Sequence, residues 1–172
     1  MNAEELRALQ RPLKDKYRED PYSGLVVHKA SGAVGEDISF HIDTGEGVVH
    51  VGLHPAAGGT GELGCSGDLL LNALVGCAGV TLGAVATALG ITIRKGSVRA
   101  EGELDYRGTM AVSKEVPVGF RSITLIFDLA CDADEEKLQT LIRLTERYCV
   151  VYQTLAAATE IKSQIIRISV DR

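Results

Sequence analysis

A run of 21 residues, from Leu69 to Leu89, most constrains what this chain can fold into. Only three of its residues are polar: Asn72, Thr81 and Thr87. Its length would suffice for a membrane-spanning helix, but no cluster of Lys or Arg flanks it to set an orientation. We therefore predict a long central helix that is buried on all sides by the rest of the protein. We predict no membrane partner.

Composition narrows the class of protein further. The chain has 172 residues, 45% of them hydrophobic and 24% charged, which fits one globular domain with its own core. Its net charge of −5 argues against nucleic acid as a partner. The charged residues 1–20 contain no apolar signal sequence. We thus predict a cytoplasmic protein whose four cysteines are free or catalytic rather than disulfide-bonded.

Residues 3–18 have the periodicity of an amphipathic helix, and "EDPYSG" contains the Pro and Gly that end it. The apolar stripe of this helix consists of Leu6, Leu9, Leu13 and Tyr17. We predict an N-terminal helical arm at 1–20 that docks in a dimer, with a loose tail as the alternative, followed by a single α+β domain at 21–172.

Alternating and β-branched segments predict the strands. Three strands at 24–30, 36–43 and 47–54 form an antiparallel meander, with glycine-bearing turns between them. A glycine-rich loop follows at 55–67, and Asp68 could cap the long helix.

After the long helix, strands are predicted at 97–106 and 121–130 and helices at 132–148 and 149–159. A strand at 160–170 closes the chain. Because strands and helices do not alternate regularly, the pattern indicates an α+β fold rather than a parallel βαβ sheet.

Two other patterns are weaker than they first look. Gly59, Gly61 and Gly64 have the G-x-G-x-x-G spacing of a dinucleotide fold, but no βαβ unit surrounds them, so a mobile loop is predicted. His50 and His54 are four residues apart in an extended segment, which separates them by about 13 Å. One metal ion cannot bridge that span.

The other histidines, His28 and His41, have no local partner in the sequence. We accordingly predict no metal site.

The cysteines carry the chemistry. Cys65 and Cys131 are most simply small hydrophobic residues. Cys77 lies mid-helix among glycines, and Cys149 lies between two predicted helices beside Arg147, where N-terminal amides would favour a thiolate. Packing in the core remains the alternative for each, and periodicity alone does not show that the two cysteines meet.

Three segments, "GDLLLNALVGCAGVTL", "LIRLTERYCVVYQTL" and "EIKSQIIRISV", resemble the OsmC/Ohr family of thiol-dependent hydroperoxide reductases. The resemblance covers most of the chain beyond about residue 22. It implies an OsmC-like α+β fold, with antiparallel sheets around a long buried central helix, in an intertwined homodimer with two active sites at the subunit interface.

The resemblance also implies the chemistry. Cys77 would be the peroxidatic thiol and Cys149 the resolving thiol, so an organic hydroperoxide would oxidise the pair to a disulfide. An external dithiol reductant, often a lipoyl group in the family, would restore both thiols. Neither a metal nor an organic cofactor is implied.

The family activates its peroxidatic thiol with an arginine from the N-terminal strands, held by a carboxylate ahead of the central helix. Asp68 occupies the position of that carboxylate. No arginine lies between Arg18 and Arg94, however, and Lys29 is the only cation there. Lys29, Arg147 or an arginine of a partner subunit are the alternatives for the activating charge.

A second hypothesis follows from the missing arginine. The same dimeric scaffold could be a non-enzymatic protein that binds a small molecule or an acyl chain, because fold does not fix function.

Overall fold

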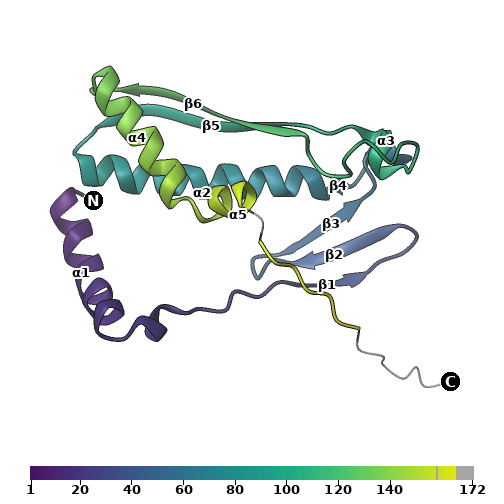
Figure 1. Cartoon of the computed structure of the whole chain (residues 1–172), viewed down its shortest axis with the longest axis horizontal. Helices are drawn as coiled ribbons and strands as arrows, with labels where there is room; N and C mark the ends of the chain where they lie inside the picture. The colour runs from purple at the N-terminus through teal and green to yellow at the C-terminus, as the bar shows by residue number, and fades with distance from the viewer. Residues whose placement is uncertain (158, 166–172) are drawn as a thin grey trace.

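The computed structural model describes residues 1–157 and 159–165. Figure 1 shows the helix α2 (Ser66–Leu89) running through the middle of the molecule. The paired strands β5 (Ile93–Glu103) and β6 (Ser122–Cys131) lie along one side of it, and a small sheet lies near its N-terminal end. The predicted α+β class is confirmed.

The N-terminal helix α1 (Ala3–Glu19) forms where the periodicity predicts it, and the 3-10 turn η1 (Pro21–Gly24) follows it. Asn2 caps α1: its side chain accepts from the amides of Glu4 and Glu5, and the Glu5 carboxylate accepts from the Asn2 amide. The apolar stripe stays largely exposed, with Leu9 62% accessible. The docking of this arm therefore remains a prediction.

The first sheet contains β1 (Ser31–Val34), β2 (Ser39–Asp43) and β3 (Val48–Gly52), antiparallel in sequence order. The predicted strand at 24–30 is wrong, because those residues form an exposed extended segment. Pairing begins instead at β1, within the stretch predicted as a turn. Gly32 makes it possible, since a Cβ there would lie 2.3 Å from the Phe40 ring of β2.

The glycine-rich loop is more regular than predicted. It contains the 3-10 turn η2 (Pro55–Ala57) and the short strand β4 (Gly64–Cys65). β4 pairs with β3 in parallel, so this sheet is not wholly antiparallel. Gly59 approaches the backbone closely: a Cβ there would lie 1.7 Å from the Leu53 carbonyl oxygen. Only glycine fits this position.

β5 and β6 pair antiparallel over nearly their whole length, from Ile93 opposite Cys131 to Glu103 opposite Ser122. The strand predicted at 97–106 begins earlier and ends earlier than expected. Asp105 turns the chain by accepting from the Arg107 amide, and the short helix α3 (Tyr106–Thr109) begins there.

α4 (Glu135–Tyr148) and α5 (Val150–Ala156) confirm the two helices predicted after β6. The strand predicted at 160–170 is not present in the described part of that segment, 160–165. The rest of it, 166–170, lies outside the described residues.

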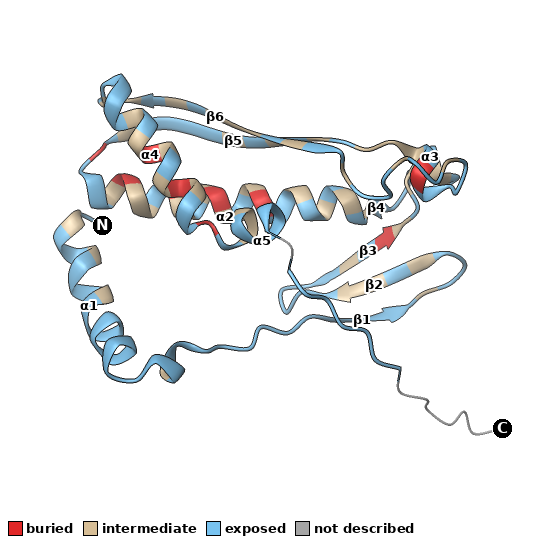
Figure 2. Cartoon of the chain, viewed as in Figure 1, coloured by how far each residue is buried: buried red, intermediate tan, exposed pale blue. Residues whose placement is uncertain are grey.

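The core follows one face of α2. Four residues spaced four apart are buried on it: Leu74, Ala78, Leu82 and Ala86. They pack against β5, β6, α4 and α5 in two adjoining clusters. Figure 2 shows that burial concentrates along α2 and α4, whereas the sheet β1–β4 is mostly exposed.

The prediction that α2 is buried on all sides is wrong for a single chain. Val80, on the face away from the core, is 78% accessible. Within the described residues α2 is also the one helix long and apolar enough to cross a membrane, by length and composition alone. Within one chain, β5, β6, α4 and α5 pack on the core face of this helix and α1 also contacts it, but the face around Val80 stays uncovered.

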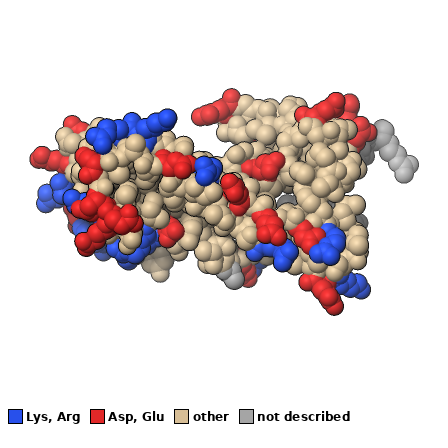
Figure 3. Space-filling model, turned by 90° about the horizontal axis from the view of Figure 1, so that it is seen from above, with Lys and Arg blue, Asp and Glu red and all other residues tan. Residues whose placement is uncertain are grey.

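Charges are mixed over the surface. Figure 3 shows acidic and basic side chains interspersed on the face seen from above, with uncharged surface between them. On this face, neither positive nor negative charge dominates a continuous area.

Candidate thiol site

The structure brings Cys77 and Cys149 together. Cys77 lies in α2 and Cys149 at the junction of α4 and α5, and both belong to the cluster around Leu74 and Ala78. Both cysteines are free thiols. Cys149 is completely buried and Cys77 is half-buried. Sequence periodicity could not show this contact, because it depends on how α4 and α5 pack on α2.

Cys149 owes its position to the junction between two helices. Its amide donates to the Thr145 carbonyl at 2.9 Å and so closes α4. Its backbone is extended, with φ −74° and ψ 111°, and its Sγ accepts from the Tyr152 amide at 3.4 Å. The one residue thus ends α4 and caps α5, which fixes its sulfur in the core.

The first-turn amides of α5 act on Cys77. Burial by itself raises the pKa of the Cys77 thiol. Hydrogen bonding from the Val151 amide, the Cys149 thiol, the Val150 amide and the Thr81 side chain outweighs burial, so the net pKa lies below that of an ordinary cysteine. Amides in the first turn of a helix have no partner four residues back, which leaves these donors available.

Cys149 is shifted in the opposite direction. Burial raises its pKa; the Tyr152 amide lowers it, but proximity to Cys77 raises it again. The net pKa of Cys149 is raised. The α5 amides do lower the pKa of Cys149, as hypothesised, but burial and the neighbouring Cys77 outweigh them, so the thiolate is favoured on Cys77 instead. The site is asymmetric, with one thiol inclined to ionise and the other to stay protonated.

Asp68 lies in the first turn of α2 but does not cap it. The helix begins three residues earlier than the prediction requires, and Cys65 is its N-cap, without a side-chain hydrogen bond. Asp68 is exposed and lines a separate cleft of about 360 Å³ together with Cys65, His54 and Tyr106. Tyr106 in that cleft has a raised pKa. Burial is the larger cause, and the charges of Cys65 and Asp68 add to it.

The two cations proposed from the sequence lie on the surface. Lys29 is exposed in the segment between η1 and β1, which Figure 1 shows running below the level of α2. Arg147 is exposed and lies over the Tyr148 ring, 5.4 Å from its centroid. The groups that lower the pKa of Cys77 most are amides, a thiol and a hydroxyl, not cations.

A cleft of about 510 Å³ adjoins the thiol cluster. Four of its apolar lining residues also pack around Cys77 and Cys149: Leu74, Ile123, Leu125 and Tyr152. The rest of the lining includes Arg121 and Glu146.

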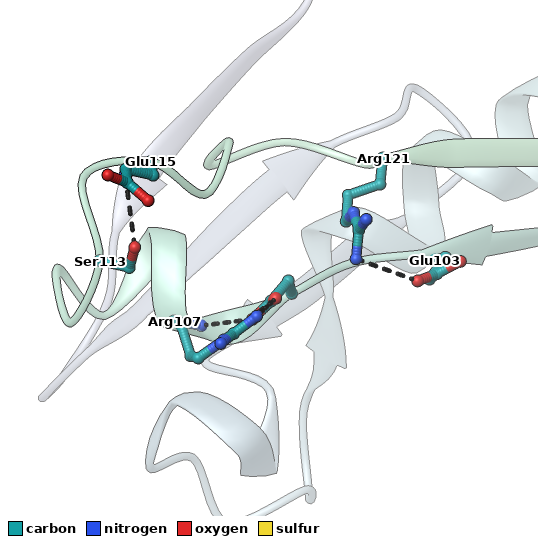
Figure 4. A network of polar contacts seen from close by, with 6 residues as sticks. Glu103, Arg107, Ser113, Glu115 and Arg121 are labelled. Atoms are coloured by element: carbon teal, nitrogen blue, oxygen red, sulfur yellow. Dashed lines mark hydrogen bonds and ion pairs between the residues drawn. The ribbon is translucent and has the colours of Figure 1, made fainter.

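Arg121 was not among the cations predicted from the sequence, which were Lys29, Arg147 and an unspecified arginine of a partner subunit. Figure 4 shows Arg121 reaching toward Glu103 on the neighbouring strand, and Nη1 lies 3.5 Å from Oε1. Antiparallel pairing of the two strands predicted after the long helix would have indicated its position. Because these strands have similar lengths, Arg121 at the start of the second would lie beside the end of the first.

The described residues contain no group of three or more His, Cys, Asp or Glu side chains arranged to hold a metal ion. His54 stacks on Tyr106, with ring centroids 5.0 Å apart. His41 does have a partner, contrary to expectation: it faces His50 across the β2–β3 ladder.

A long helix packed against a two-stranded sheet, with one cysteine at its middle and a second at a helix junction, defines a dithiol protein of α+β fold. The family model of OsmC-like proteins matches residues 59–164. The chain therefore belongs to the OsmC-like family. No curated protein matches it.

Solved structures show the same fold. An OsmC-like protein from Mycoplasma pneumoniae has a TM-score of 0.64 and 21% identity, covering 76% of this chain and 88% of its own. An organic hydroperoxide resistance protein OsmC from Legionella pneumophila has a TM-score of 0.59 and 15% identity, covering 76% and 91%. The organic hydroperoxide resistance protein OhrB of Bacillus subtilis has a TM-score of 0.53 and 22% identity, covering 76% and 90%.

Proposed function

We propose that this protein reduces organic hydroperoxides with Cys77 as the peroxidatic thiol and Cys149 as the resolving thiol. The observation that carries the proposal is the packed pair of free thiols with pKa values shifted in opposite directions. Membership of the OsmC-like family and the names of two similar structures support the same activity.

The chemistry follows from that asymmetry. The Cys77 thiolate attacks the terminal peroxide oxygen, the O–O bond breaks, and the alkoxide takes a proton and leaves as an alcohol. Cys77 becomes a sulfenic acid. The Cys149 sulfur then attacks the sulfenic sulfur, a disulfide forms and water leaves. An external dithiol returns two electrons by exchange and is itself oxidised to a disulfide.

The amides of α5 supply part of what the family draws from an arginine. A thiolate needs donors or positive charge around it, and here the Val150 and Val151 amides contribute without any cation from the N-terminal strands. The cleft of about 510 Å³ beside the pair has both apolar and polar lining residues, and its apolar part would receive the organic group of the substrate.

We further propose that the working unit is a homodimer. The exposed face of α2 contains Gly76, Gly79 and Gly83, where an added Cβ would meet nothing within 4 Å, together with the exposed Val80. Small residues allow a second helix to approach closely, so this face suits another copy of α2.

A dimer would also explain Asp68. On its own helix, Asp68 lies nine residues from Cys77, about 13 Å along the axis. In a dimer, Asp68 and an N-terminal cation such as Lys29 would act on Cys77 of the other copy, across the interface rather than within one chain.

The alternative is a binding protein that uses the same cleft without redox chemistry. The size of the cleft, about 510 Å³, favours a small apolar ligand or part of an acyl chain. On this hypothesis Cys77 would be a packing residue that peroxide does not oxidise.

Anaerobic consumption of cumene hydroperoxide, with dihydrolipoamide as the reductant, distinguishes the peroxidase from the binding protein. Wild-type protein should turn over and Cys77→Ser should not, whereas Cys149→Ser should stop after one equivalent with a sulfenic acid that dimedone traps. Cys131→Ser is the matched control and should retain turnover. Wild-type consumption no faster than that of Cys77→Ser would overturn the peroxidase proposal in favour of the binding protein.

A further inference from the structure

Two histidines face each other on the outer side of the first sheet. The β2–β3 register places His41 directly opposite His50, and their ring centroids are 4.3 Å apart at an interplanar angle of 63°. His41 is half-buried and His50 is exposed. Strand alternation puts them on the face opposite the buried Val51, so the pair belongs to neither the core nor the thiol cluster.

The ladder places these two side chains at the closer of its two pair types. The Thr44 amide donates to the Gly47 carbonyl at 3.0 Å, which makes Thr44 and Gly47 the hydrogen-bonded pair that closes the hairpin. Hydrogen-bonded and non-hydrogen-bonded pairs alternate along an antiparallel ladder, so His41 and His50 form a non-hydrogen-bonded pair. In such pairs the Cα atoms are only about 4.5 Å apart and the side chains are closest.

The ring separation suits chelation. With metal–nitrogen bonds of about 2.0 Å, each imidazole centroid lies about 3.2 Å from the ion. Two imidazoles bound at right angles would then have centroids about 4.5 Å apart, and two bound at the tetrahedral angle about 5.2 Å apart. The observed 4.3 Å is close to the first value, so the ring spacing matches a square-planar or octahedral ion. The rings now meet edge to face at 63°, so the side chains must rotate to direct one nitrogen of each at the ion.

Gly35 keeps space for the His41 ring. A Cβ at position 35 would lie 2.8 Å from His41 Nε2 and 2.3 Å from Ser39 Oγ. Both contacts are shorter than real Cβ atoms make, so a side chain there would displace the His41 ring.

We propose that His41 and His50 together bind one divalent transition-metal ion of tetragonal preference, Ni(II) or Cu(II), with water in the remaining positions. Imidazole is a ligand that both ions favour. Among the described residues no third metal-binding side chain joins the pair. The site is therefore an open, two-ligand chelate, and it stands independently of the thiol chemistry.

Titration calorimetry with NiCl₂ at pH 7.5 tests the proposal, since Ni(II) does not readily oxidise the thiols. The wild-type protein should bind one ion per chain. His41→Gln and His50→Gln should each weaken binding at least about 10-fold, the least that even an outer-shell partner of a metal ligand commonly contributes. Gly35→Ala should also weaken it, because the His41 ring is displaced.

His54→Gln and His28→Gln are the matched controls and should bind as the wild type does. Thermal unfolding without metal checks that every variant is folded. Binding that survives both His41→Gln and His50→Gln, or that is lost in Cys77→Ser instead, would overturn the site. Either result leaves the hydroperoxide assay unaffected, so the two proposals fail separately.

Discussion

The two halves of this molecule use their apolar residues differently. Along α2, β5, β6 and α4, apolar side chains pack inside one chain, and Leu141 is completely buried. In the segment 25–52, most apolar side chains remain accessible: Leu25 is 76% and Val34 is 81% exposed. The half built from α2, β5, β6 and α4 forms its own core. The segment 25–52 instead presents an apolar surface that another molecule is suited to cover.

The largest expected effect tests the packed half. Leu141→Ala should lower the free energy of unfolding by about 2–5 kcal/mol, because it removes a fully buried side chain and leaves a cavity. Urea denaturation measures it. Leu25→Ala is the matched control and should change stability by less than about 0.5 kcal/mol if that residue stays in water. If Leu25→Ala lowered the free energy of unfolding as much as Leu141→Ala, the proposed difference between the two halves would be wrong.

The exposed face of α2 sharpens the comparison. Val80→Asp should convert the proposed dimer to monomers, because it would bury a charge against the second helix. Sedimentation equilibrium measures the mass. Val112→Asp, at a similarly exposed valine in the β5–β6 connection, should leave the dimer intact. A Val80→Asp protein with the wild-type mass would show that this face is not the interface.

A smaller effect tests the thiol site inside the packed half. Val150→Pro removes one amide hydrogen at the first position of α5, where proline fits a helix well. The pKa of Cys77 should rise, so less thiolate is present at pH 6 and iodoacetamide alkylation of Cys77 should slow several-fold. The rate is measured by mass spectrometry from pH 5 to 9.

Val150→Ala is the control, because it keeps the amide and changes only an exposed side chain. It should alkylate as the wild type does. Equal rates in Val150→Pro and Val150→Ala would show that this amide does not stabilise the Cys77 thiolate.

The smallest effect concerns the loop that joins β5 and β6. Arg107 holds the pKa of Asp105 at about 2, below its usual 3.8, so the folded state favours the carboxylate. This contribution to stability is complete above about pH 4 and is lost as the pH falls through about 2. Urea midpoints at pH 5 and pH 3 should therefore differ less in Asp105→Asn than in the wild type. The same pH dependence in both proteins would contradict this.

Local patterns were enough wherever a segment's partners lie in its own sequence neighbourhood. The helix at 3–18 and the helices after β6 form as predicted, because caps and 3.6-residue periodicity are local signals. The strand predicted at 24–30 failed for the converse reason. Its β-branched residues favour extension, but a strand needs a partner, and the ladder with β2 begins only at Ser31.

The thiol site divides in the same way. The sequence by itself determined the α+β class, the central helix and the two cysteines, because residue types and their spacing in the chain encode them. Only the tertiary structure decided that Cys77 and Cys149 touch, that the α5 amides favour the anion on Cys77, and that His41 faces His50. Those relations depend on the packing of α5 on α2 and on strand register, which join residues far apart in the chain.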